Sequence, residues 1–131
     1  MSIIRVVLDT NVLVSALLSR EGSPAKIYRM FLTRALTLAY CTGILDEYQD
    51  VLYRPRLRIL HDDADIVIAA VRQYGEKILP KPSINTMLDE GDRVFYDTAK
   101  CANAYLVTGN TKHYPIEPFI LTPVAFLELK Q

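Results

Sequence analysis

The feature that most constrains the fold is the alternation of short apolar runs with helical patterns along the chain. Residues 3–8 form a nearly continuous, β-branched apolar run, which is typical of a strand buried on both faces. Residues 36–41 and 104–108 resemble it, and residues 77–79 and 119–121 are weaker strand candidates. Because long connections join parallel strands through right-handed crossovers, we predict a three-layer α/β/α sandwich with a central parallel sheet.

Helices are predicted between these strands from their periodicity and capping residues. The expected ranges are 12–18 behind the capping side chains of Asp9, Thr10 and Asn11, 24–34 with Ser23 as N-cap and Pro24 in the first position, 44–53, 64–74 capped by Asp62 and Asp63, and 92–103. Residues 83–91 form a polar loop that leads to Asp92. The first strand therefore meets its helix at Asp9.

Length and composition limit the classes of protein that remain. The chain of 131 residues is half apolar, so we expect residues 1–131 to form one domain. No charged leader or membrane-length apolar run is seen, which predicts a soluble, cytoplasmic protein without membrane contact. Cys41 and Cys101 form no C-x-x-C pair, so neither a disulfide framework nor a zinc site is predicted. Fifteen acidic and fifteen basic residues balance, so any attraction to nucleic acid must come from a local patch.

Acidic residues gather at one expected edge of the sheet, where the parallel strands end and ligands bind in such folds. Asp9 follows the first strand. Glu47 lies one turn into the helix after the second strand, and Asp92 starts the helix before the late strand. Both helical acids border a buried arc and can turn toward Asp9. Asp97 lies on the other flank of its arc, beside Cys101, which makes its approach to the site less direct.

Three neighbouring carboxylates repel one another and raise their own pKa values unless a cation is present. A set of oxygen ligands without Cys or His favours Mg²⁺ or Mn²⁺ over zinc. Such an ion activates water toward a phosphodiester, so the predicted reaction is phosphodiester hydrolysis. Each acid also has a structural interpretation, since Asp9 and Asp92 could serve as N-caps and Glu47 could be a solvated helix residue.

The segment V-V-L-D-T-N-V at residues 6–12 resembles the opening motif of PIN-domain nucleases. Residues 42–52 present Glu47 where the family has its second acid, and residues 89–99 followed by 104–110 present Asp92 as the third. The resemblance covers nearly the whole chain. It implies a sheet of about five parallel strands with the first strand central, Mg²⁺- or Mn²⁺-dependent endoribonuclease activity on RNA, and frequent homodimers.

The chain also resembles a small prokaryotic subgroup of toxins from toxin–antitoxin pairs, which implies an antitoxin partner that blocks the site. One departure concerns the loop after the late strand, where many members carry a fourth aspartate and this chain has Asn110. Asn110 can hold a metal-bound water but weakens a second ion site, for which Asp97 is the expected compensating ligand. If neither serves, the chain is a catalytically weak or inactive RNA-binding or regulatory module.

Further polar residues near this edge are candidates for substrate contact. Asn11 would orient Asp9 or contact phosphate, and Thr108 would bind a carboxylate or the substrate; both have a purely structural alternative. Arg54 and Arg56 offer a small platform for phosphates and bases, or a basic helix end that the helix dipole favours. A phosphatase or nucleotide-binding domain is disfavoured because no glycine-rich loop follows the first strand.

Overall fold

A parallel sheet forms the centre of the computed structural model, which describes residues 3–84, 87 and 89–129. Within these residues the sheet has five strands in the order β3-β2-β1-β4-β5, and all neighbouring pairs are parallel. The strands are β1 (Arg5–Leu8), β2 (Thr37–Tyr40), β3 (Glu76–Lys77), β4 (Tyr105–Val107) and β5 (Ile120–Leu121). The predicted parallel sheet with the first strand at its centre is confirmed.

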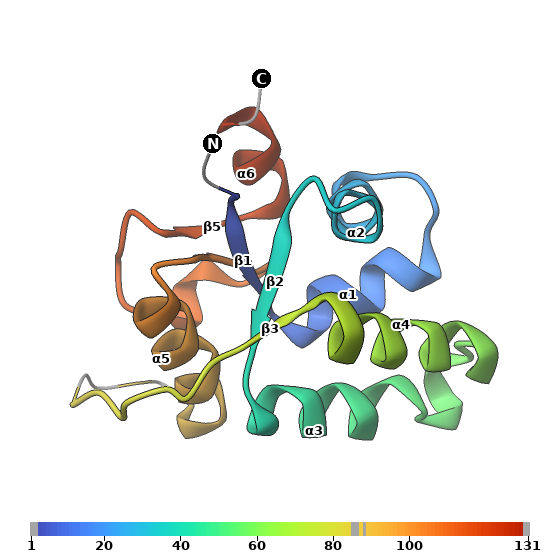
Figure 1. Ribbon diagram of the computed structural model, residues 1–131, viewed down its shortest axis with the longest axis horizontal. Coiled ribbons are helices and arrows are strands. Elements are labelled where there is room, and N and C mark those ends of the chain that lie inside the picture. Colours follow the sequence, from blue (N-terminus) through green and yellow to red (C-terminus); the bar gives the residue numbers. More distant parts are fainter. Residues whose placement is uncertain (1–2, 85–86, 88, 130–131) are drawn as a thin grey trace.

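Helices cover both faces of this sheet. They are α1 (Thr10–Leu18), α2 (Ser23–Leu32), α3 (Thr42–Leu52), α4 (His61–Tyr74), α5 (Arg93–Ala102) and α6 (Pro123–Leu129), with short 3₁₀ turns η1 (Pro55–Leu57), η2 (Glu90–Asp92) and η3 (Thr111–His113). In Figure 1, α1, α2 and α4 lie on one side of β1 and β2, and α5 lies on the other. The predicted α/β/α sandwich is thus confirmed. No helix in the described ranges is long and apolar enough to cross a membrane.

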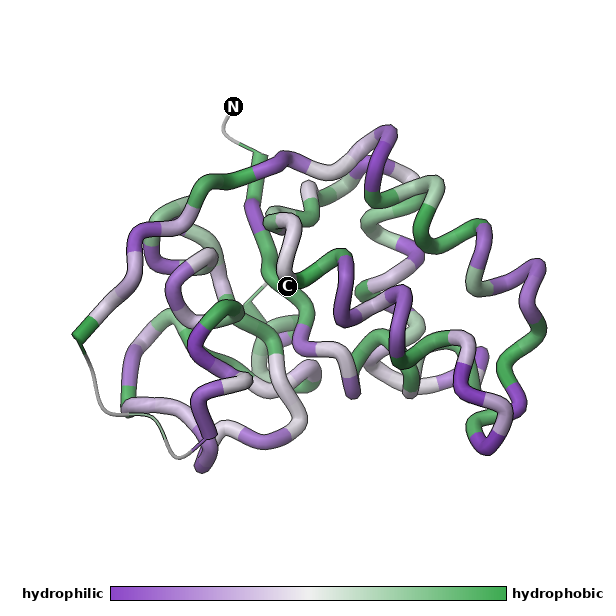
Figure 2. The backbone as a smooth tube through the Cα atoms, turned by 90° about the horizontal axis from the view of Figure 1, so that it is seen from below, coloured by the Kyte–Doolittle hydropathy of each residue, from purple (hydrophilic) through white to green (hydrophobic). Residues whose placement is uncertain are grey.

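The core explains why the central strand is apolar on both faces. Val6, Val7 and Leu8 are completely buried, since helices cover the sheet on each side. Apolar and polar positions alternate along the surrounding helices, as the tube in Figure 2 shows. The register pairs Leu8 with Val107, so the residues that follow β1 and β4 meet at the same edge of the sheet.

Several helix starts differ from the sequence-based boundaries, for local reasons. The prediction of Ser23 as an N-cap is wrong: Gly22, with a φ of 107° that favours glycine, caps α2, and Ser23 is its first residue. Helix α4 begins at His61, so Asp62 and Asp63 lie in its first turn, where carboxylates stabilise the helix dipole, rather than capping it. Of the predicted loop at residues 83–91, positions 85, 86 and 88 lie outside the described residues.

Helix α6 was not predicted from the sequence. Its start carries a clear local signal, because proline is common in the first turn of a helix and threonine is a common N-cap. The Thr122 hydroxyl accepts a hydrogen bond from the backbone N–H of Ala125 at 3.1 Å. Phe126 is completely buried and packs against the ring of Tyr105 on β4 in a T-shaped arrangement, which holds the short helix in place.

Candidate active site

Asp9 stands directly after β1 and is held by donors from distant parts of the chain. Its backbone N–H donates to the Val107 carbonyl at 3.0 Å, which extends the β1–β4 pairing by one residue. Its Oδ2 accepts hydrogen bonds from the Thr108 hydroxyl at 2.8 Å and the Tyr114 hydroxyl at 3.2 Å. Asp9 occupies the N-cap position of α1, yet its carboxylate caps no backbone N–H. Asp9 is therefore the N-cap residue by position, as its structural interpretation held, but its carboxylate is bound to Thr108 and Tyr114 instead of the helix.

Glu47 reaches the same edge from α3. Its Oε2 accepts a hydrogen bond from the hydroxyl of Thr10, the residue after Asp9. The neighbouring Tyr48 is buried and donates its hydroxyl to the Leu8 carbonyl at 2.5 Å. Burial, followed by the charges of Asp9 and Glu47, raises the pKa of Tyr48 well above its usual value, so it remains a donor. Helix α3 is thus connected by two hydroxyl hydrogen bonds to the last residue of β1 and the first residue of α1.

Asp92 comes to this edge at the start of α5. Its side chain is 19% exposed, and it caps no backbone N–H. Its Oδ2 is buried without a hydrogen-bond partner in the described structure, and His113 Nδ1 lies 3.6 Å away. Burial is the main cause that raises the pKa of Asp92, and the charges of Asp9, Asp89 and Glu47 raise it further. Asp9 and Glu47 thus act on Asp92 as neighbouring like charges.

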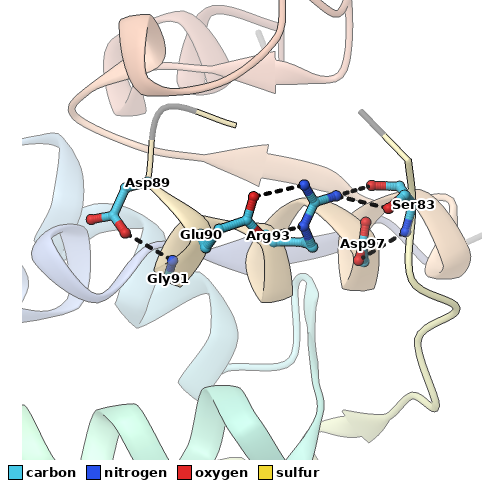
Figure 3. Close-up of polar contacts among 6 residues, drawn as sticks. All are labelled: Ser83, Asp89, Glu90, Gly91, Arg93 and Asp97. Carbon is cyan, nitrogen blue, oxygen red and sulfur yellow. Dashed lines mark hydrogen bonds and ion pairs between the residues drawn. The ribbon is translucent and has the colours of Figure 1, made fainter. Parts of the chain in front are cut away.

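The turn before α5 places Asp92 through short-range contacts, which Figure 3 shows. Asp89 Oδ1 accepts a hydrogen bond from the Gly91 backbone N–H at 2.8 Å, which closes the turn into η2. Arg93 binds Glu90 with two nitrogens, at 2.7 and 2.9 Å, and its third nitrogen donates to the carbonyl of Ser83 at 2.8 Å. These contacts connect the segment before the turn to the first residues of α5.

The three carboxylates line one cavity of about 330 Å³. Asn11, Asn110, Arg54 and Arg56, all predicted as ligands or substrate contacts, line the same cavity. The remaining lining residues are Thr10, Val14, Asp50, Val51, Leu57 and His113. Arg54 is paired with Asp50 at 2.7 Å. The cavity therefore joins an acidic group to two cationic side chains, an arrangement suited to a phosphate-containing ligand.

Asp97, the expected fourth acid, does not join this group. It is 5% exposed and lines a separate cavity with Ser83, Lys100 and Cys101. Its Oδ2 accepts a hydrogen bond from the Ser83 backbone N–H at 3.2 Å, as Figure 3 shows, and its Oδ1 has no hydrogen-bond partner in the described ranges. Five helical residues turn the chain by about 140° beyond one full turn, so Asp97 cannot share the direction of Asp92.

The loop after β4 carries the other two predicted residues. Thr108 is completely buried, which keeps it from a substrate; its hydroxyl donates to Asp9 and accepts the Asn110 backbone N–H at 3.0 Å. Asn110 is exposed, and its amide nitrogen lies 2.8 Å from Nε2 of His113. Thr108 therefore donates a hydrogen bond to a carboxylate, which is one of the two roles predicted for it. Asn110 lines the cavity and is exposed to a ligand there.

The donor set fits a hard divalent ion. All three acids offer oxygen, and Asp92 has a buried oxygen without a hydrogen-bond partner among the described residues. In residues 3–84, 87 and 89–129, no group of three or more acidic, histidine or cysteine side chains lies close enough together to hold a metal ion by itself. Magnesium commonly uses one or two carboxylates and completes its shell with water and substrate phosphate. The acids therefore suit such a partly hydrated ion.

Tyr114 is a neighbour of the site that sequence reasoning missed. It is 6% exposed, and burial, followed by the charges of Asp9 and Asp92, raises the pKa of its hydroxyl above the usual value. The available signal was its place directly after His113, close to the predicted edge. A single tyrosine near a loop does not show which carboxylate it will meet, so the contact with Asp9 required the structure.

Comparisons with known proteins agree with this architecture. Residues 5–112 match the family model described as the PIN domain. The chain is also 31% identical over 110 residues to an uncharacterized protein of the archaeon Methanocaldococcus jannaschii. The aligned region covers 82% of this chain and 71% of the relative. No solved structure matches the chain. The family match includes all three acids, Asp9, Glu47 and Asp92, and ends before Tyr114.

Proposed function

This chain belongs to the PIN-domain family, and we propose that it is a metal-dependent endoribonuclease that hydrolyses RNA phosphodiester bonds. The observation that carries the proposal is the convergence of Asp9, Glu47 and Asp92, from three separate elements, on one cavity. The raised pKa of Asp92, caused by burial and by the neighbouring acids, supports it. Like charges raise the pKa of a carboxylate, and carboxylates with perturbed pKa values cluster at functional sites.

In this proposal, Asp9, Glu47 and Asp92 would hold Mg²⁺ or Mn²⁺, and Asn110, which lines the same cavity, would contact a water bound to the ion. The bound ion supplies a polarised water and neutralises charge that develops on the phosphoryl group. Thr108 orients Asp9 through its hydroxyl, and Thr10 orients Glu47 in the same way. Arg54 and Arg56 bind phosphates of the RNA backbone at the arginine-bearing part of the cavity.

The finer proposal is that the chain acts in the cytoplasm as the toxin of a toxin–antitoxin pair, as a single domain and as a homodimer. The resemblance of the chain to the small prokaryotic subgroup of toxins supports the toxin role. Expression in a bacterial host is expected to arrest growth, and the Asp9→Asn variant is expected to permit it. Normal growth with fully active wild-type enzyme would contradict the toxin role and leave the ribonuclease proposal standing.

The ribonuclease proposal is tested by cleavage of end-labelled single-stranded RNA with Mg²⁺, Mn²⁺ or a chelator. Asp9→Asn should reduce cleavage by more than the roughly 10- to 100-fold loss typical of residues that only support a ligand. Asp46→Asn is the matched control, since Asp46 is exposed on α3 beside Glu47 and does not line the cavity. Unchanged cleavage by Asp9→Asn would refute the site. RNA binding without metal-dependent cleavage would instead favour the inactive RNA-binding module.

A further inference from the structure

We propose that Tyr114 is a positioning residue that fixes the carboxylate of Asp9 in the orientation needed to bind a divalent ion. The inference rests on the proposed function. It concerns a side chain beyond the region that matches the family model, on the loop between β4 and β5. Three observations lead to it: the geometry at Asp9, the burial of the tyrosine, and the way in which the loop is connected to Thr108.

The geometry at Asp9 distinguishes its two oxygens. Oδ2 accepts two hydroxyl hydrogen bonds, from Thr108 at 2.8 Å and from Tyr114 at 3.2 Å. A carboxylate oxygen has two lone pairs, so these donors fill the capacity of Oδ2. Oδ1 accepts no hydrogen bond from the residues that the structure describes. Two donors from different positions of the segment between β4 and β5 restrict the orientation of the carboxylate, and they leave Oδ1 for a ligand from the cavity.

The burial of Tyr114 makes its hydroxyl specific for Asp9. A buried hydroxyl is costly unless it forms a hydrogen bond, and a phenylalanine would fill the same space without this cost. The Tyr114 hydroxyl donates to Asp9, a residue 105 positions earlier in the chain, and to no other acceptor in the described structure. The hydroxyl of Tyr114 therefore binds the Asp9 carboxylate, while its ring packs in the hydrophobic core.

The loop connects both donors into one unit. The Thr108 hydroxyl that donates to Asp9 also accepts the backbone N–H of Asn110 at 3.0 Å. The next residues form η3, and the Tyr114 backbone N–H donates to the Thr111 carbonyl at 3.1 Å. The turn that begins at Thr108 thus ends by returning Tyr114 to the same carboxylate oxygen. A shift of this turn would disturb both hydrogen bonds to Asp9.

The test compares Tyr114→Phe with Tyr96→Phe in the full chain. Tyr96 is a matched control, because it is buried, donates its hydroxyl to the carboxylate of Glu117 at 2.9 Å, and does not line the acidic cavity. Mn²⁺ binding is measured by titration calorimetry, and RNA cleavage is measured as a function of both RNA and Mn²⁺. Tyr114→Phe should weaken Mn²⁺ binding by about 10- to 100-fold, with little change in KM for RNA. Tyr96→Phe should leave Mn²⁺ binding unchanged.

Two further variants separate the possible failures. In an Asp9→Asn background, Tyr114→Phe should cause little additional loss of Mn²⁺ affinity, because its effect acts through the Asp9 carboxylate. Equal losses in both backgrounds, or equal losses from Tyr114→Phe and Tyr96→Phe, would overturn the inference in favour of a general structural role. Wild-type Mn²⁺ affinity in Tyr114→Phe would overturn it as well. Wild-type affinity and cleavage in Asp9→Asn alone would instead overturn the proposed function, and the inference with it.

Discussion

Replacing Thr108 by valine tests whether this buried hydroxyl holds the candidate site together. Thr108 is 0% exposed, and valine keeps its branched shape, so the variant removes hydrogen bonds without opening a cavity. The hydroxyl donates to Asp9 Oδ2 at 2.8 Å and accepts the Asn110 backbone N–H at 3.0 Å. The variant therefore removes one hydrogen bond to a charged group and one to a neutral group.

The expected magnitude follows from these two bonds. A hydrogen bond to a charged group contributes about 1.5–3 kcal/mol, and a neutral one contributes about 0.5–1.5 kcal/mol. Asn110 is exposed, so water can replace part of the second contribution. We therefore expect Thr108→Val to lower the free energy of unfolding by about 2–4 kcal/mol. The loss should be smaller in an Asp9→Asn background, where the charged partner is absent.

The assay is urea denaturation near neutral pH with a chelator present. Thr98→Val is the control, because Thr98 is also completely buried and donates only to the sulfur of Cys41 at 3.4 Å. Its loss should be below about 1 kcal/mol, since sulfur is a weak acceptor. If Thr108→Val costs no more than Thr98→Val, or costs the same with and without the Asp9 carboxylate, the reasoning about Asp9 is refuted.

Three other predictions concern Asp92, Asp97 and Arg56. Asp92→Asn should raise the melting temperature of the metal-free protein near pH 7. The pKa of Asp92 is raised from its ordinary value of 3.8, so the stability linked to its protonated form is present below that value and is lost as pH rises through the folded-state pKa. Thermal melts should show the gain shrinking toward pH 4; a constant gain would contradict the pKa argument. Asp97→Asn should leave Mn²⁺ affinity unchanged in calorimetry, because Asp97 lines a separate cavity. A tenfold loss of Mn²⁺ affinity would show that Asp97 contributes to the metal site. Arg56→Ala should reduce the slope of the logarithm of the binding constant for single-stranded RNA against the logarithm of salt concentration by about 0.7. Lys26→Ala, a change at an exposed residue of α2 away from the cavity, should leave this slope unchanged. Equal slopes for Arg56→Ala and wild type would exclude a phosphate contact of Arg56.

Local patterns in the sequence were sufficient for the outline of the fold and the position of three acids. The apolar run that ends at Leu8 requires burial on both faces, and this places Asp9 at the carboxyl end of the central strand. Glu47 and Asp92 follow from the same logic, because Glu47 lies one turn into α3 and Asp92 directly precedes α5, and both helices border that edge. These positions depend on periodicity and on strand direction, which neighbouring residues determine.

Helix starts were less predictable from the sequence, since several residues competed for each N-cap. Gly22 and Ser23 both suit the start of α2, and only the backbone φ at Gly22 decided between them. Asp9 has the side chain of a good N-cap, but its carboxylate found stronger partners elsewhere. Capping preferences are worth about 1 kcal/mol, so tertiary hydrogen bonds to a charged group can override them.

For Asp9, the sequence by itself determined its place at the end of β1, while the tertiary structure alone decided its partners. Thr108 and Tyr114 lie 99 and 105 residues away along the chain, and no local pattern relates them to Asp9. Tertiary packing likewise directed Asp92 toward the acidic cavity and Asp97 toward Ser83. The physical reason is that periodicity fixes which residues share a helix face, whereas packing against the sheet sets the direction in which that face points.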